Sequence, residues 1–252
     1  MEQTAIMEQL KNSGNPIVLR NLQYRGAGPN AYGVPARVLA AMGKAIPHDN
    51  QLAKSLYETG NLDAMRLSAL AAIPESMTQK DFEEMLSGAY CFLLVDSVVA
   101  ELLSRATPDM AFKLAAKWKH STDSRIQSAG WAALSKLILR YPAQDYWKYN
   151  LSSHLKLAKK KYARQTDAVR FARSNFIQTA GIYLPFGRPE ALRYAEKISP
   201  DKVRLSSQSL KLLDPKKAIE TAISSQDINA SKGVSGQAEI SEDALPESAE
   251  EK

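Results

Sequence analysis

Residues 91–103 read CFLLVDSVVAELL, and this stretch decides how the rest of the chain is interpreted. It lies inside a helix predicted over Tyr90–Arg105, which is apolar almost all round and must therefore be buried on several sides. A second long helix is predicted over Thr122–Tyr141, where apolar residues recur at spacings of three and four. We take these two helices as a packed pair at the centre of the fold.

Asp96 is the exception within the apolar helix. A carboxylate rarely lies inside such a helix without a partner, a cationic ligand or a role in chemistry. Two interpretations follow. Asp96 either carries chemistry, or it lies at the lip of a packed helix and is satisfied by a neighbouring Lys or Arg.

The composition is that of a globular chain with a substantial core. Of its 252 residues, 44% are hydrophobic, enough for one large domain or two small ones. No stretch approaches the roughly 20 apolar residues of a membrane span, and the segment Met1–Asn12 is amphipathic, unlike a secretory signal. We therefore expect a cytoplasmic protein without membrane contact.

The single cysteine, Cys91, excludes an internal disulfide, and its apolar surroundings favour an inert thiol. The three histidines lack ligand spacing, so we expect no metal.

Charge is distributed unevenly along the chain. The net charge is +6, but the segment Ser224–Lys252 carries seven acidic residues against two lysines, a balance of −5, so the residues before it carry +11. A body that basic suits a polyanionic partner. The segment itself combines low hydrophobicity, Ser, Gly and net negative charge, which predicts disorder.

Helix signals recur along the chain, whereas strand signals do not. Caps, prolines and glycines divide it into roughly ten to twelve helices joined by short turns. Pairs of helices that recur at roughly 40 residues are typical of HEAT-like solenoids, in which each pair buries its face by stacking on the next. We predict an all-α fold, a right-handed α-solenoid of HEAT-like antiparallel helix pairs over residues 1–223, followed by a disordered acidic tail over 224–252. A globular α-bundle is the alternative. Ligands of solenoids usually bind the concave face.

Four features resemble the AlkD-like DNA alkylation repair proteins, which are HEAT-like repeat DNA glycosylases. These features are the helix start Gly33-Val34-Pro35, the helix pair from Leu52 to Ala72, the step Val95-Asp96, and Trp118 followed by Ser121. The second of them contains LYETG at residues 56–60 and RLSAL at residues 66–70. The similarity extends from about Tyr24 to Leu184, and the order and spacing of the features carry it.

The resemblance implies a reaction. In that family, the aspartate of the Val-Asp step stabilises the cationic sugar left when an alkylated purine departs, and it aligns with Asp96. An N3- or N7-alkylpurine is already positively charged, so its glycosidic bond is weak, and a carboxylate lowers the barrier by attracting the oxocarbenium-like centre. This chemistry requires neither a metal nor a cofactor.

The other family positions are changed. One family tryptophan falls on Phe92 and a second falls near Phe176, so that an aromatic face with a weaker quadrupole is expected at both. The family arginine that grips the DNA backbone falls on Ser128. Arg125 lies one turn earlier on the same helix face and could reach the same phosphate; the alternative is a solvated charge at the start of the helix.

A cluster of basic residues is the best candidate for binding backbone phosphates. Its members are Lys156, Lys159, Lys160, Lys161, Arg164, Arg170 and Arg173. The alternative is a solvated helix face without a partner.

Three hypotheses follow for a chain that we expect to be monomeric. The first is a monofunctional glycosylase that removes cationic N3- or N7-alkylpurines from double-stranded DNA, with Asp96 as the catalytic carboxylate and Phe92, Phe176, Arg125 and Ser128 at the lesion. The second is a non-catalytic HEAT-like protein that binds bent or branched DNA. The third is a protein-interaction scaffold that does not contact DNA.

Overall fold

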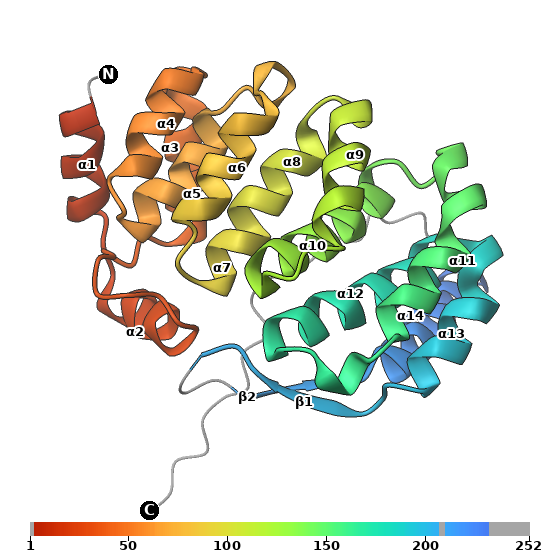
Figure 1. The fold of residues 1–252 in the computed structure, drawn as a ribbon. Helices are drawn as coiled ribbons and strands as arrows, with labels where there is room; N and C mark the ends of the chain where they lie inside the picture. The colour runs from red at the N-terminus through yellow and green to blue at the C-terminus, as the bar shows by residue number, and fades with distance from the viewer. Residues whose placement is uncertain (1–2, 207–209, 232–252) are drawn as a thin grey trace, which may run out of the picture.

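The computed structural model describes residues 3–206 and 210–231, in which helices follow one another along an arc (Figure 1). The arc runs from α1 to α13, and α2 and a β hairpin face each other across its opening. The longer helices are α1 (Gln3–Asn12), α2 (Pro16–Tyr24), α3 (Ala36–Ala45), α4 (Asn50–Glu58), α5 (Leu62–Ala71), α6 (Gln79–Gly88), α9 (Pro108–Trp118), α10 (Ser124–Arg140), α11 (Asp145–Lys159), α12 (Asp167–Tyr183), α13 (Arg188–Glu196) and α14 (Pro215–Ser231). The predicted solenoid of helix pairs is confirmed.

Helix starts follow the sequence signals. The Asn61 side chain accepts hydrogen bonds from the first backbone N–H groups of α5, and Thr78 forms a reciprocal capping box with Asp81 at the start of α6. The helix expected over Tyr90–Arg105 is divided into α7 (Phe92–Leu94), a π-helical segment η2 (Val95–Ala100) and α8 (Glu101–Arg105). Asp96 therefore lies in a widened turn of a kind that is frequent at functional sites.

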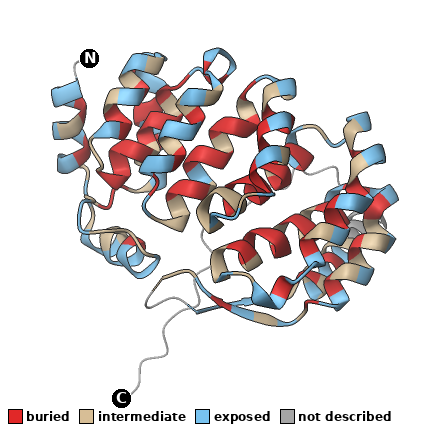
Figure 2. Ribbon diagram, in the orientation of Figure 1, coloured by how far each residue is buried: buried red, intermediate tan, exposed pale blue. Residues whose placement is uncertain are grey.

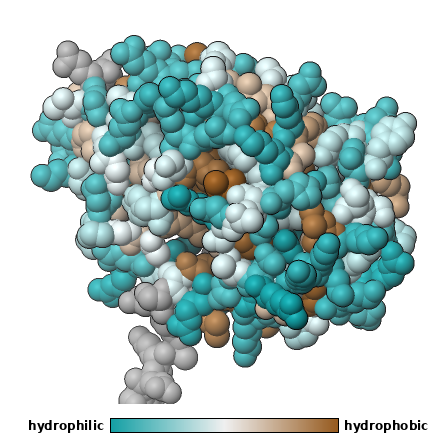
Figure 3. Space-filling model, viewed as in Figure 1, coloured by the Kyte–Doolittle hydropathy of each residue, from teal (hydrophilic) through white to brown (hydrophobic). Residues whose placement is uncertain are grey.

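Buried residues are concentrated where neighbouring helices face one another (Figure 2), and α10 packs against α9, η2 and α12. Close approach of α9 and α10 depends on Gly130, because a Cβ atom there would lie 2.3 Å from the backbone nitrogen of Lys119. Trp131 and Trp147 are the bulkiest fully buried residues of the described chain. Hydrophilic side chains cover most of the face shown in Figure 3 and surround a small hydrophobic area near its middle.

A buried carboxylate fixes the loop between α2 and α3. Asp63, which is fully buried, accepts hydrogen bonds from the backbone nitrogens of Tyr32, Gly33 and Val34 at 2.7, 2.9 and 3.1 Å. Gly33 has a φ of 76° and its Cβ position is blocked by Leu19, so no other residue type fits there without strain. The helix start Gly33-Val34-Pro35 is therefore held in place by Asp63 on α5.

The hairpin is an element that the sequence patterns do not predict. Strands β1 (Asp201–Arg204) and β2 (Leu210–Leu213) pair antiparallel and pack over α12 through Val203, Leu213 and Phe171. The Ser206 hydroxyl, which follows β1, donates a hydrogen bond to the carbonyl oxygen of Tyr24 in α2, so the hairpin and α2 are in contact across the opening of the arc.

Helix α14 continues to Ser231, so it includes the first residues, 224–231, of the predicted tail. The remainder of the predicted tail, residues 232–252, lies outside the described residues. Within the part of the chain that is described, no helix has both the length and the apolar composition needed to cross a membrane.

Candidate functional site

Asp96 lines a cavity of about 710 Å³ that is enclosed by α2, α3, α5, the helical segments around Asp96, α12 and the hairpin. The carboxylate is half-buried, and within the described residues it has neither a hydrogen bond nor an ion pair. The polar and aromatic residues that line the cavity are Arg25, Arg66, Phe92, Asp96, Ser97, Glu101, Arg105, Phe171 and Lys211. Asp96 therefore faces a space large enough for a ligand.

Two aromatic rings and an amine form one wall of this cavity. Phe92 and Phe171 meet edge to face with their centroids 4.9 Å apart, an arrangement that stabilises both ring positions. The Nζ atom of Lys211 on β2 lies 4.7 Å from the centroid of the Phe171 ring. The sequence predicts Phe92 at the site. It does not predict Phe171 or Lys211, and Lys211 is brought there by the unpredicted hairpin.

Cations outnumber carboxylates around the cavity. Arg25, Arg66, Arg105 and Lys211 line it, against Asp96 and Glu101. Glu101 is already paired with Lys136 and Arg140 at 3.4 Å each. Partial burial lowers the pKa of the Lys211 amine, and the positive charge of Arg25 lowers it further. The carboxylate of Asp96 raises the pKa of the same amine. The lining of the cavity is therefore positive, with four cations against the carboxylates of Asp96 and Glu101. One of the four, Arg66, is also paired with Asp63 at 3.7 Å.

Phe176 does not lie at this site. It is fully buried and packs against Trp131 at 5.2 Å and His154 at 6.0 Å between ring centroids. The prediction that it lines a lesion pocket is therefore corrected. It lies five residues beyond Phe171 on α12, which places it on a different face of the helix, packed against α10.

Arg125 and Ser128 lie on one face of α10 and line a second hollow of about 520 Å³, which shares Phe92 and Leu205 with the Asp96 cavity. Arg125 is half-buried and donates hydrogen bonds to the carbonyl oxygens of Ser87 and Ala89, the last acceptors of α6. Ser128 is buried, and its hydroxyl donates to the Arg125 carbonyl oxygen. Arg125 is thus a helix cap rather than a solvated charge, and its contact with a phosphate stays a prediction.

The predicted basic cluster divides into two parts. Arg173 is 4% exposed and donates to the carbonyl oxygens of Ala158 and Lys160, with its pKa lowered to about 10 by burial. Arg170 is held by the carboxylates of Asp167 and Asp201. Both are structural, which corrects their assignment to phosphate binding. The other five residues are exposed, and phosphate binding by them stays a prediction. They lie at the end of α11, in the turn after it and in the short helix η3 (Tyr162–Arg164): Lys156, Lys159, Lys160, Lys161 and Arg164.

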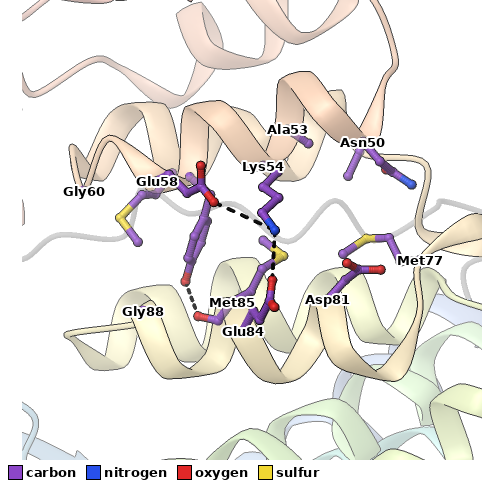
Figure 4. A pocket seen from close by; sticks show the side chains of 13 residues that line it. Asn50, Ala53, Lys54, Glu58, Gly60, Met77, Asp81, Glu84, Met85 and Gly88 are labelled. Atoms are coloured by element: carbon purple, nitrogen blue, oxygen red, sulfur yellow. Dashed lines mark hydrogen bonds and ion pairs between the residues drawn. The ribbon is translucent and has the colours of Figure 1, made fainter.

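A separate groove of about 300 Å³ lies between α4 and α6 (Figure 4). Its methionine-rich floor is bordered by Lys54, which is ion-paired with Glu84 at 3.0 Å and Glu58 at 3.9 Å, and the Tyr57 hydroxyl donates to the Met85 carbonyl oxygen. These polar groups are already satisfied within the groove. Across the described residues, moreover, no cluster of His, Cys, Asp or Glu is arranged to hold a metal ion.

Comparison with known proteins agrees with this geometry. No family model matches the chain. A solved structure has a TM-score of 0.83 and 27% sequence identity, covering 90% of this chain and 95% of its own. It represents a new family of proteins related to the HEAT-like repeat DNA glycosylases with affinity for branched DNA structures. Two uncharacterized proteins, from Listeria innocua and Listeria monocytogenes, are each 26% identical over 178 residues, which is 70% of this chain and 75% of theirs.

Fold and site together define a HEAT-like helical-repeat protein with a basic cavity on its inner side. Its particular resemblance, predicted from the sequence, is to the HEAT-like repeat DNA glycosylases, and the match in structure confirms it.

Proposed function

We propose that this chain binds DNA at the Asp96 cavity and that it prefers branched structures over linear duplex. The observation that carries the proposal is the excess of cations around a ligand-sized cavity. The structural neighbour adds support, since affinity for branched DNA is described for it at 27% identity over most of this chain.

Arginine and lysine side chains neutralise backbone phosphates and release counterions, which gives affinity without reading sequence. Arg25 is exposed, and Arg66 on α5 and Arg105 on α8 line the same space. Where DNA strands separate at a branch, a base that has lost its partner can stack on an aromatic face, and Phe92 offers one beside these cations. The five exposed basic residues at the end of α11 and in η3 supply a second contact to a phosphate backbone.

Fluorescence anisotropy tests this proposal. A labelled four-way junction and a linear duplex of equal length are titrated with the protein and with Arg25→Glu, and the matched control is Lys80→Glu on α6, outside the cavity. The junction is expected to bind more tightly than the duplex, and Arg25→Glu is expected to weaken both by about tenfold or more, because it reverses a charge that faces phosphates. Absence of binding at low salt, or equal effects of the two variants, contradicts the proposal.

Excision of alkylated bases is the second candidate. It is favoured by the position of Asp96, half-buried in an open cavity without a hydrogen-bond partner among the described residues. It is disfavoured by the buried Ser128 at the family arginine position and by the burial of Phe176. Release of 7-methylguanine from duplex DNA by the protein, abolished in Asp96→Asn, would establish this activity. Equal inactivity of both proteins, with DNA binding retained, would exclude it.

A further inference from the structure

One side chain of the cavity has a reactivity that DNA binding alone does not use. Lys211 is the single lysine among the described residues that line the Asp96 cavity; its other cations are arginines. An arginine remains charged in proteins and is a poor nucleophile, whereas a lysine amine becomes nucleophilic once it loses its proton. The surroundings of Lys211 decide how readily it does so.

Two effects lower the pKa of the Lys211 amine and so favour its neutral form. Burial is the larger effect, and the positive charge of Arg25 is the second. The face of the Phe171 ring, 4.7 Å from Nζ, fixes the position of the amine at the cavity. Asp96 lines the same cavity, and its negative charge raises the pKa of the Lys211 amine, against the effects of burial and Arg25. Among the described residues Asp96 has no hydrogen-bond partner. A nucleophilic amine and an available carboxylate therefore face one ligand-sized space.

We propose that Lys211 forms a covalent imine with the aldehyde of an abasic site in DNA and that Asp96 acts as the base in the strand cleavage that follows. The proposal rests on the proposed DNA binding, which brings the abasic sugar into the cavity. It adds an activity that requires no alkylated base and no cofactor.

The reaction balances with water as its single co-reactant. The neutral Nζ of Lys211 adds to C1′ of the open-chain deoxyribose. The adduct takes up a proton from solvent and loses water, which gives the protonated imine, and the hydrolysis below returns that proton to solvent. The carboxylate of Asp96 removes a proton from C2′, the electrons of that C–H bond form a conjugated double bond, and the C3′–O bond breaks with the phosphate as leaving group. Water then hydrolyses the imine, which regenerates the Lys211 amine and releases an unsaturated aldehyde.

Reductive trapping tests the imine directly. The full chain is incubated with a labelled duplex that contains one abasic site, together with cyanoborohydride, and the covalent adduct is separated by denaturing electrophoresis and located by peptide mass spectrometry. Lys211→Arg keeps the charge but cannot form the imine, and Lys202→Arg on the neighbouring strand is the matched control. Both lysines are exposed, so neither change disturbs the core.

The adduct is expected on Lys211, and Lys211→Arg is expected to lower trapping by about tenfold or more while Lys202→Arg leaves it unchanged. Asp96→Asn is expected to keep trapping but to slow strand cleavage by about a hundredfold. Adducts scattered over other lysines, or equal trapping by Lys211→Arg, overturn the proposal. Anisotropy on the same DNA separates the two claims, since retained binding without an adduct refutes the imine alone, whereas lost binding refutes the proposed function.

Discussion

A buried histidine gives the fold a predictable response to acid. His154 on α11 is 3% exposed; its Nδ1 lies 2.9 Å from Nζ of Lys119, and its Nε2 lies 2.9 Å from the Tyr146 hydroxyl. An ammonium group has donors but no acceptor, so Nδ1 must accept the hydrogen bond from Lys119 and the ring proton must reside on Nε2. Protonation of Nδ1 would remove this bond and place two positive charges side by side.

The pKa of His154 reflects this arrangement. Burial is the largest cause, followed by the charge of Lys119, and together they lower the pKa from 6.5 to about 3. Between pH 6.5 and about 3 the His154 side chain is protonated in the unfolded chain but not in the folded chain. The contribution of neutral His154 to the free energy of unfolding is therefore fully present above pH 6.5 and is lost as the pH falls. At pH 5, which is 1.5 units below 6.5 and still above 3, the loss amounts to about 2 kcal/mol.

Urea denaturation at pH 7.5 and pH 5 measures this effect. Between these values Lys119, whose pKa burial lowers to about 8, remains mostly charged and adds little. His154→Gln is expected to unfold more easily at pH 7.5 but to lose about 2 kcal/mol of the pH dependence. The matched control His48→Gln, at an exposed position, should retain the full dependence. An unchanged pH dependence in His154→Gln would refute the reasoning, since the titrating group would then lie elsewhere.

Three further predictions follow from single contacts. Asp63→Ala removes the acceptor of three backbone N–H groups in a fully buried site. Urea titrations should show a free energy of unfolding that is lower by about 3 to 5 kcal/mol, and a loss below about 1 kcal/mol would contradict this. Gly130→Ala should lower the thermal midpoint by more than about 8 °C because its Cβ would lie 2.3 Å from the Lys119 nitrogen; Gly28→Ala, whose Cβ would meet an ordinary 3.6 Å contact, should change it little. Asp96→Asn should bind the four-way junction about two- to fivefold more tightly in anisotropy titrations, because it removes a negative charge from a cavity that faces phosphates, and weaker binding would argue against DNA in that cavity.

Much of the helical framework could be predicted from the sequence because it is encoded locally. Caps such as Asn61 and Thr78, and apolar residues spaced three and four apart, specify where α5, α6 and α10 lie. The hairpin could not be predicted in this way. Each of its strands has four residues, and Leu210 and Leu212 are more than half exposed, so its stability depends on packing against α12 and on contacts with α2.

The candidate site was predicted unevenly for the same reason. Asp96 and Phe92 belong to one short helical stretch whose pattern shows them directly. Arg170 and Arg173 look like surface charges in the sequence, yet they are engaged by Asp201 and by the carbonyl oxygens at the end of α11, which are partners that no local pattern reveals. Lys211 was missed because the hairpin that brings it to the cavity was missed.

Site-specific crosslinking measures most directly whether DNA occupies the Asp96 cavity. A photoreactive benzoylphenylalanine is placed at Ser97, which is exposed and lines the cavity, and in a second protein at Lys80, which is exposed on α6 outside it. Irradiation with a labelled four-way junction is predicted to give a covalent protein–DNA product from the Ser97 position and little from the Lys80 position. Equal yields at both positions, or a product from Lys80 alone, would contradict binding at the cavity.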